Sequence, residues 1–250
     1  MNGTAVLLSG GLDSAVLLAD EASRGEVQPL YVSVGLAWEA AERAMVSQFL
    51  AQARFHGRVR PLVSLSVDMR DVYAASHWAV EGRPPAYHTP DEDVYLPGRN
   101  IVLLGKAGVY CAAARLERVV LGTLAHNPFP DATPEFRAAM ARALTQGLAH
   151  DLQIDAPYAG SSKAEVIKRG IELGLPLELT LSCMSPVVAR RSSLVARAAT
   201  TSEQRETRNE QPDLPLHCGT CSKCRERHDA FRELGLDDPT VYEDERHVRA

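Results

Sequence analysis

Residues 9–14, with the sequence SGGLDS, bring two glycines, two hydroxyl groups and a carboxylate together between an apolar strand-like run and an apolar helix-like run. Glycine lets a backbone approach a ligand closely, and a helix that begins near Leu12 directs its unpaired N–H groups and positive dipole end at the same turn. This glycine loop (residues 9–14) therefore indicates an anion site. Asp13 fits an anion site if a magnesium ion lies between its carboxylate and bound phosphates.

The glycine loop thus predicts a nucleotide bound with a metal ion, and the hydroxyl groups of Ser9 and Ser14 can donate to phosphate oxygens. Its spacing differs from the Walker loop, whose lysine is absent, and from the dinucleotide-binding G-x-G-x-x-G pattern. An ordinary strand-to-helix turn with a capping residue would contain similar residues, so that interpretation stays open. The predicted nucleotide-binding residues are Leu8, Ser9, Gly10, Gly11, Leu12, Asp13 and Ser14.

Four of the five cysteines form a second candidate site. Cys218, Cys221 and Cys224 follow a C-x-x-C-x-x-C pattern, and Cys183 in LTLSCMSP is the candidate for a fourth ligand. In a reducing compartment this spacing favours metal over disulfides. Four thiolates at tetrahedral geometry describe a closed structural zinc site, and with four cysteines present His217 is expected to act beside the site or at the surface.

The elements that must position these residues alternate along the chain. Short apolar runs predict strands at residues 4–8, 29–34, 61–67, 119–122 and 152–156. Helical periodicity predicts helices at residues 13–24, 39–56, 101–115, 134–150 and 163–173. This alternation predicts the α/β class, with a doubly wound parallel sheet of about five strands covered on both faces.

Two segments interrupt the alternation. Residues 75–98, the long connection, are rich in Pro, His and Asp and are expected to cover a ligand site, with His77, Trp78 and His88 as candidate lid residues. Residues 187–215 are dominated by Arg, Ser, Thr, Glu and Gln and predict a poorly ordered polar insertion. We therefore expect a nucleotide-binding α/β domain at residues 1–180 and a C-terminal cysteine-rich region at residues 181–250.

Composition limits the classes of function. A chain of 250 residues that is 45% hydrophobic can bury a full core. The formal charge of −5 offers no broad basic surface, so nucleic acid is not the expected partner. No secretory signal and no run of about 20 apolar residues is visible, so we expect a cytoplasmic protein without a membrane span.

Five motifs, taken in order along nearly the whole chain, resemble the 7-cyano-7-deazaguanine synthase family of PP-loop ATP pyrophosphatases. The motifs are SGGLDS at 9–14, YLPGRN at 95–100, NPFPDATPEF at 127–136, GSSKAEVI at 160–167 and HCGTCSKCRER at 217–227. The resemblance implies a PP-loop fold, bound zinc, ATP with Mg²⁺ and a homodimer. It also implies a ligase that forms carbon–nitrogen bonds, converting 7-carboxy-7-deazaguanine, ammonia and ATP into the 7-cyano base through an amide.

This chemistry requires groups that activate a carboxylate by attack on the α-phosphate and absorb the developing charge. Within the matching motifs, Arg99 and Lys163 are the candidates for phosphate or pyrophosphate contacts, with Ser162 beside them. The predicted catalytic residues are Asp13, Ser14, Arg99 and Lys163. An ordinary surface role for the two cations stays open.

Asp131 and Glu135 are candidates for binding the substrate, because carboxylates accept hydrogen bonds from the amino and ring N–H groups of a guanine-like base. Both residues also stand at the head of a predicted helix, where acids are favoured without any ligand. The two interpretations are left open.

One segment departs from the family pattern. The family usually carries a Tyr-Gly-Gln-Arg-like stretch after its second strand, whereas this chain has SVGLAWEAAE at 33–42, which keeps Gly35 and loses the Gln-Arg pair. The polar contacts of that pair must be lost, or be remade with Trp38 and Glu39. The gap between Cys183 and Cys218 is also longer than in the family, and loop-closure entropy grows slowly enough for a metal to close it.

Several alternative functions remain. A relative could stop at amide formation or act on another carboxylate. A PP-loop tRNA thiolase would need a reactive cysteine, but Cys111 lies in an apolar helical run where a buried, inert thiol is expected. A non-catalytic nucleotide-binding module would have no need for Asp13, Arg99 and Lys163 together.

Overall fold

The computed structural model describes residues 3–55, 57–188 and 214–248. Its centre is a five-stranded sheet in the order β3-β2-β1-β4-β5, and every neighbouring pair of strands is parallel. The strands are β1 Gly3–Leu7, β2 Val27–Ser33, β3 Val63–Ser66, β4 Leu116–Val120 and β5 Gln153–Asp155. The predicted parallel sheet of about five strands is confirmed.

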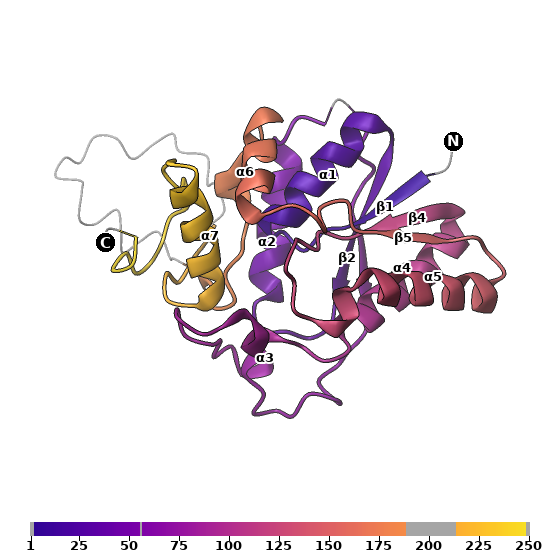
Figure 1. Cartoon of the computed structure of the whole chain (residues 1–250), viewed down its shortest axis with the longest axis horizontal. Coiled ribbons are helices and arrows are strands. Elements are labelled where there is room, and N and C mark those ends of the chain that lie inside the picture. The colour runs from indigo at the N-terminus through magenta and orange to yellow at the C-terminus, as the bar shows by residue number, and fades with distance from the viewer. Residues whose placement is uncertain (1–2, 56, 189–213, 249–250) are drawn as a thin grey trace, which may run out of the picture.

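Helices cover both faces of the sheet (Figure 1). The helices α1 (Leu12–Arg24), α2 (Glu39–Gln52) and α6 (Lys163–Glu172) lie on one face, and α4 (Arg99–Ala114) and α5 (Pro134–Leu148) lie on the other. Because side chains alternate along a strand, neighbouring strand residues serve different cores. Ala5 packs with the α4 side and Val6 with the α1 side, so β1 is buried on both faces.

The strand order creates a crevice at the carboxyl end of β1. The chain leaves β1 toward β2 on one side, and after β3 it crosses back to place β4 on the other side. Ligands of open α/β sheets bind at such a switch point, outside the carboxyl ends of the strands. The glycine loop follows β1 at this point.

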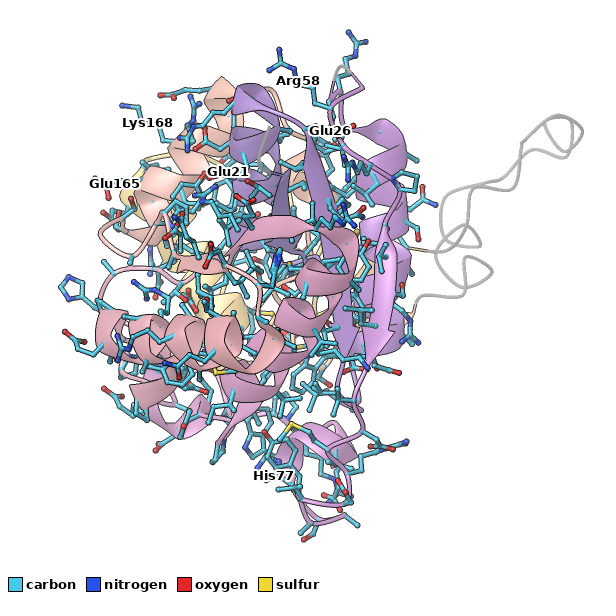
Figure 2. All side chains as sticks on the ribbon, turned by 90° about the vertical axis from the view of Figure 1, so that its right-hand side faces the viewer. Glu21, Glu26, Arg58, His77, Glu165 and Lys168 are labelled. Atoms are coloured by element: carbon cyan, nitrogen blue, oxygen red, sulfur yellow. The ribbon has the colours of Figure 1, made fainter. Side chains whose placement is uncertain are left out.

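The long connection contains the short helix α3 (Trp78–Glu81) and the 3₁₀ turn η1 (Asp91–Val94). It runs alongside the C-terminal region. The Ser222 N–H donates to the Pro85 carbonyl at 3.3 Å, and Ala86 forms an isolated antiparallel β-bridge with Cys221. Figure 2 shows His77 of this segment at the end of the molecule opposite Arg58.

The C-terminal region adds α7 (Ser222–Glu233), a helix that the sequence analysis did not predict. Two further 3₁₀ turns, η2 (Pro130–Ala132) and η3 (Leu177–Leu179), lie before α5 and before Cys183. The strands β6 (Val187–Val188) and β7 (Pro215–Leu216) pair antiparallel at the two ends of the predicted polar insertion. The interior of that insertion lies outside the described residues.

The predicted boundary between residues 180 and 181 is crossed by direct contacts. The Leu181 N–H donates to the Gly10 carbonyl of the glycine loop at 2.7 Å. Arg227 of α7 is fully buried and donates to Thr180 Oγ1 at 2.8 Å. These contacts hold the C-terminal region against the glycine loop. Within the described residues, no helix is long and apolar enough to cross a membrane.

Candidate active site

The glycine loop is held in shape by its own hydrogen bonds. Gly10 has φ of +83°, and a Cβ there would come within 3.2 Å of the Glu42 carbonyl, so this position requires glycine. Ser14 Oγ donates to the Gly11 carbonyl at 2.9 Å, and Ser9 N–H donates to Ser14 Oγ at 3.3 Å. These hydrogen bonds fix the turn between β1 and α1. The first N–H groups of α1 therefore point into a space that is formed without a ligand.

Asp13 and Lys163 meet beside this loop. Lys163 begins α6, and its Nζ lies 2.6 Å from Asp13 Oδ2. Burial raises the pKa of Asp13, and the Lys163 ammonium only partly offsets that effect. The other oxygen, Asp13 Oδ1, is buried and has no hydrogen-bond partner in the described part of the chain. An unpartnered buried carboxylate oxygen is the donor that a hard cation such as Mg²⁺ would use.

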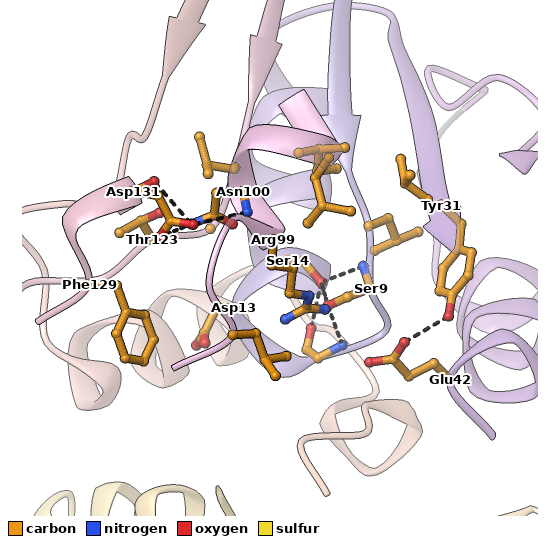
Figure 3. A pocket seen from close by; sticks show the side chains of 18 of the residues that line it. Ser9, Asp13, Ser14, Tyr31, Glu42, Arg99, Asn100, Thr123, Phe129 and Asp131 are labelled. Carbon is orange, nitrogen blue, oxygen red and sulfur yellow. Dashed lines mark hydrogen bonds between the residues drawn. The ribbon is translucent and has the colours of Figure 1, made fainter. Parts of the chain in front are cut away.

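Two adjoining cavities open from the glycine loop, with volumes of about 250 and 470 Å³. Both are lined by Ser9, Asp13 and Arg99, and Figure 3 shows the first of them. The first extends over the ends of the strands to Tyr31 and Asp131. The second is further lined by Trp38, Trp78, Ser162, Lys163, Met184 and Glu226. A ligand with two parts joined at the glycine loop fits this arrangement.

Arg99 supplies the second cation at the loop. It follows Gly98, whose φ of +76° lets the chain turn into the first residue of α4. The Nε atom of Arg99 is buried without a hydrogen-bond partner among the described residues. The guanidinium thus has an unused donor at the cavity where the two compartments meet.

The four predicted metal ligands converge. The sulfur atoms of Cys183, Cys218, Cys221 and Cys224 all lie within 4.8 Å of one another. A tetrahedral site with metal–sulfur bonds of about 2.3 Å would separate its sulfurs by about 3.8 Å, and the Cys218–Cys224 and Cys221–Cys224 distances are 3.9 and 3.5 Å. Backbone N–H groups of Ser185 and Cys218 point at Cys183 Sγ. This cysteine cluster can hold a metal ion.

Comparison with known proteins identifies the family of the chain. A family model described as "Queuosine biosynthesis protein QueC" matches residues 4–235. The chain belongs to the QueC family. Relatives named 7-cyano-7-deazaguanine synthase from Methanopyrus kandleri and Methanoculleus marisnigri are each 31% identical, covering 97% of this chain and 99% and 100% of their own. A third, from Anaeromyxobacter dehalogenans, is 32% identical over 95% of this chain and 94% of its own.

Among solved structures, the U34-tRNA thiolase NcsA from Methanococcus maripaludis shares 12% identity and a TM-score of 0.44, covering 70% of this chain and 58% of that chain. Similarity at this level does not bear on activity.

The segment that departs from the QueC pattern builds one wall of the first cavity. Glu39 Oε1 accepts from the backbone N–H groups of Val34 and Gly35 at 2.7 and 3.0 Å, and its other oxygen accepts from Ser33 Oγ at 2.5 Å. Glu39 therefore braces the turn after β2 from within. Trp38 donates from its indole Nε1 to Glu42 Oε1 at 3.1 Å, so Trp38 and Glu39 both make polar contacts at this turn.

Glu42 is a residue of this site that sequence reasoning missed. It is buried and lines both cavities, and its Oε2 accepts from Tyr31 OH at 2.8 Å. Burial raises the pKa of Glu42 to about 7, although the charge of Arg99 lowers it in part. The available signal was its position, one turn after Trp38 within the departing segment.

The structure places the two predicted substrate-binding acids differently. Asp131 is buried at the first cavity, and its two carboxylate oxygens accept from Asn100 N–H at 3.1 Å and Asn100 Nδ2 at 3.2 Å. It thus caps the first turn of α4. Glu135 is exposed in the first turn of α5 and is not among the residues that line either cavity. The helix-start interpretation holds for Glu135 at α5, whereas Asp131 binds the start of α4 instead, and a role in substrate binding stays a prediction for both.

Ser162 and His217 have structural partners. Ser162 caps α6, because its Oγ accepts from the Glu165 N–H at 3.2 Å while Glu165 accepts from the Ser162 N–H. His217 is buried beside the cysteine cluster and accepts from the Ser182 N–H at 3.0 Å through Nε2. Burial lowers the pKa of His217 to about 3, so the ring is neutral at physiological pH.

Proposed function

We propose that the chain is an ATP-dependent ligase that adenylates 7-carboxy-7-deazaguanine and uses ammonia to form 7-cyano-7-deazaguanine. The observation that carries the proposal is the Asp13–Lys163 pair at a preformed glycine loop, with one Asp13 oxygen unpartnered in the cavity. Membership of the QueC family and the names of the relatives support this choice of substrate.

The positively charged groups at the glycine loop would bind and neutralise the phosphates of ATP. A carboxylate is a poor electrophile, so its oxygen must attack the α-phosphate of ATP, displace pyrophosphate and become part of an AMP leaving group. The N–H groups of the glycine loop, the Lys163 ammonium and the Arg99 guanidinium would neutralise the phosphate charge that develops. Mg²⁺, held by Asp13, would supply further charge neutralisation on the phosphates.

Ammonia then attacks the acyl adenylate, AMP leaves, and an amide results. The amide oxygen then attacks the α-phosphate of a second ATP and displaces pyrophosphate, and loss of AMP together with the two protons of the amide nitrogen gives the nitrile. Both rounds need the same phosphate contacts, so one glycine loop can serve both. The adjoining cavities give the nucleotide and the heterocycle separate compartments that meet at this loop.

The proposal includes zinc in the cysteine cluster, because four closely spaced sulfurs with backbone N–H donors form the ligand set of a closed structural zinc site. It also includes a homodimer, by resemblance to the family, and a cytoplasmic location, where a reducing environment keeps the cysteines free to bind metal. Nucleic acid and membranes are not proposed as partners.

The test is a mass-spectrometric assay of the purified protein with ATP, magnesium, ammonium and 7-carboxy-7-deazaguanine. AMP together with a product of nitrile mass supports the proposal. Formation of the amide alone would show a relative that stops halfway. If neither the amide nor the nitrile forms, 7-carboxy-7-deazaguanine is not the substrate. A thiolase role is disfavoured by Cys111, the cysteine outside the cluster, because burial raises the pKa of its thiol to about 12.

A further inference from the structure

A carboxylate from the C-terminal region lies beside Lys163. Glu226 Oε1 is 3.3 Å from Lys163 Nζ, and Asp13 Oδ2 contacts the same nitrogen at 2.6 Å. The other oxygen of Glu226 is 2.6 Å from Lys223 Nζ. The Lys163 side chain is only 13% exposed, so these two carboxylates are its anchors in a largely enclosed place.

The position of Glu226 is fixed by its neighbours in the chain. Cys221 is at the N-cap position of α7, Cys224 lies in the first turn, and Glu226 follows two residues later. Arg227, the next residue, is fully buried and donates to Thr180 Oγ1 at 2.8 Å and to the Leu177 carbonyl at 2.9 Å. The cysteine cluster and the buried guanidinium therefore set the direction in which Glu226 points.

The two carboxylates that contact Lys163, those of Asp13 and Glu226, differ in their other contacts. Asp13 also has the unpartnered oxygen that fits Mg²⁺, and a carboxylate that turns to coordinate a cation gives up part of its contact with the ammonium. An ammonium group has three donors, so one remains for a phosphate when two are held by carboxylates. An anchor that does not move with the metal would keep this third donor aimed at the cavity.

We propose that Glu226 is a positioning residue that holds the Lys163 ammonium at the glycine loop when Asp13 is engaged elsewhere. The cysteine-bearing helix α7 thereby completes the phosphate site of the α/β domain. This inference rests on the phosphate-binding role that the proposed function gives to Lys163.

The kinetic test uses Glu226→Gln, which keeps the length of the side chain and removes its charge. We expect kcat to fall about tenfold, because small misplacement of a catalytic group is costly, while KM for ATP changes by less than about threefold. Glu226→Asp, which keeps the charge, should recover part of the loss. Glu233→Gln, at the exposed last residue of the same helix, is the matched control and should behave as the parent.

A measurement without turnover tests the holding contact itself. Asp13→Asn imitates the loss of the first anchor, and acetylation of Lys163 by acetic anhydride is followed by peptide mass spectrometry, with the exposed Lys168 as internal reference. In Asp13→Asn, Glu226 should keep acetylation slow. Adding Glu226→Gln should speed it about tenfold, because loss of a nearby opposite charge frees the amine.

The two experiments fail in different ways. A parent enzyme that gives no product with the deazaguanine acid would overturn the proposed function, and the acetylation rates would still decide the role of Glu226. Equal acetylation of Lys163 in the single and double variants would overturn the inference. So would parent-like kcat in Glu226→Gln, or a kcat loss matched by an equal loss of bound metal.

In a Lys163→Met background, Glu226→Gln should lower kcat by less than about a further twofold, and a full additional loss of kcat would contradict action through Lys163.

Discussion

The indole rings of Trp38 and Trp78 stack with their centroids 5.8 Å apart and their planes 12° apart. This contact joins the turn after β2 to the long connection, and both rings line the second cavity. Trp78, a candidate lid residue, thus forms part of the wall of this cavity. His77, by contrast, stacks on Tyr73 and accepts from the Ala79 N–H, so it caps α3.

The first prediction concerns Glu42 and pH. Its pKa is raised from 4.5 to about 7, so between these values the folded state binds more protons than the unfolded state. The contribution of Glu42 to stability is therefore fully present below pH 4.5 and is lost as pH rises through 7. At 1.36 kcal/mol per pH unit, the difference corresponds to about 3 kcal/mol.

Glu42→Gln removes this ionisation. We expect its free energy of unfolding, relative to the parent, to increase between pH 5 and pH 8, measured by urea denaturation. Glu92→Gln, at an exposed glutamate of η1, provides the comparison and should show no such trend. A constant difference between Glu42→Gln and the parent across this range would contradict the raised pKa.

The second prediction concerns Asp13. Asp13→Asn keeps the shape of the side chain but weakens its hold on Mg²⁺ and on Lys163. We expect the rate of pyrophosphate release to fall at least about 100-fold, as for the loss of other groups that stabilise developing charge. The melting temperature should stay close to that of the parent, since burial already disfavours the charged form of Asp13. Normal turnover would remove Asp13 from the mechanism, and the exposed Asp237→Asn is the control.

Periodicity in the sequence predicted the sheet and its main helices, because the strand residues that alternate between the two cores are apolar on both faces. It missed α7, whose sequence SKCRERHDAFRE is mostly charged. That helix is held by the buried Arg227 and by the cysteine cluster, and these are long-range contacts that no local pattern reveals.

In the candidate site, too, local motifs revealed some residues and missed those that are held by long-range contacts. Asp13, Lys163 and Arg99 could be proposed from motifs, and the structure brings them to one cavity. Glu42 had only its place in the segment that departs from the family pattern as a signal, and Glu226 had none, because a glutamate on a helix gives no local sign of being buried against a partner. Helix α4 begins at Arg99, two residues before the predicted start, because Asp131 from a distant segment caps its first turn.

The third prediction concerns the metal. Cys221 is buried at the N-cap position of α7, where its side chain makes no capping hydrogen bond, so its loss should act on the helix through the cysteine cluster. We expect Cys221→Ser to lower the bound zinc, measured by elemental analysis, and to lower the melting temperature, since metal binding contributes directly to folding. Cys111→Ser, which alters a buried cysteine outside the cluster, should leave the metal content unchanged. Equal metal content in Cys221→Ser and the parent would contradict the assignment of this ligand.

The last prediction separates backbone conformation from close packing at the cluster. Gly219 lies between two ligands with φ of +78°, and a Cβ there would come within 1.9 Å of the Asp244 carbonyl oxygen. Gly235 has φ of +65° and open space around its Cβ position. Gly235→Ala should therefore cost about 1 kcal/mol of unfolding free energy for the positive φ alone. Gly219→Ala should cost about 3 kcal/mol or more, because backbone must move, and it should also reduce zinc retention under a chelator. Equal effects of the two substitutions, measured by denaturation and zinc release, would show that the Asp244 contact does not constrain the cluster.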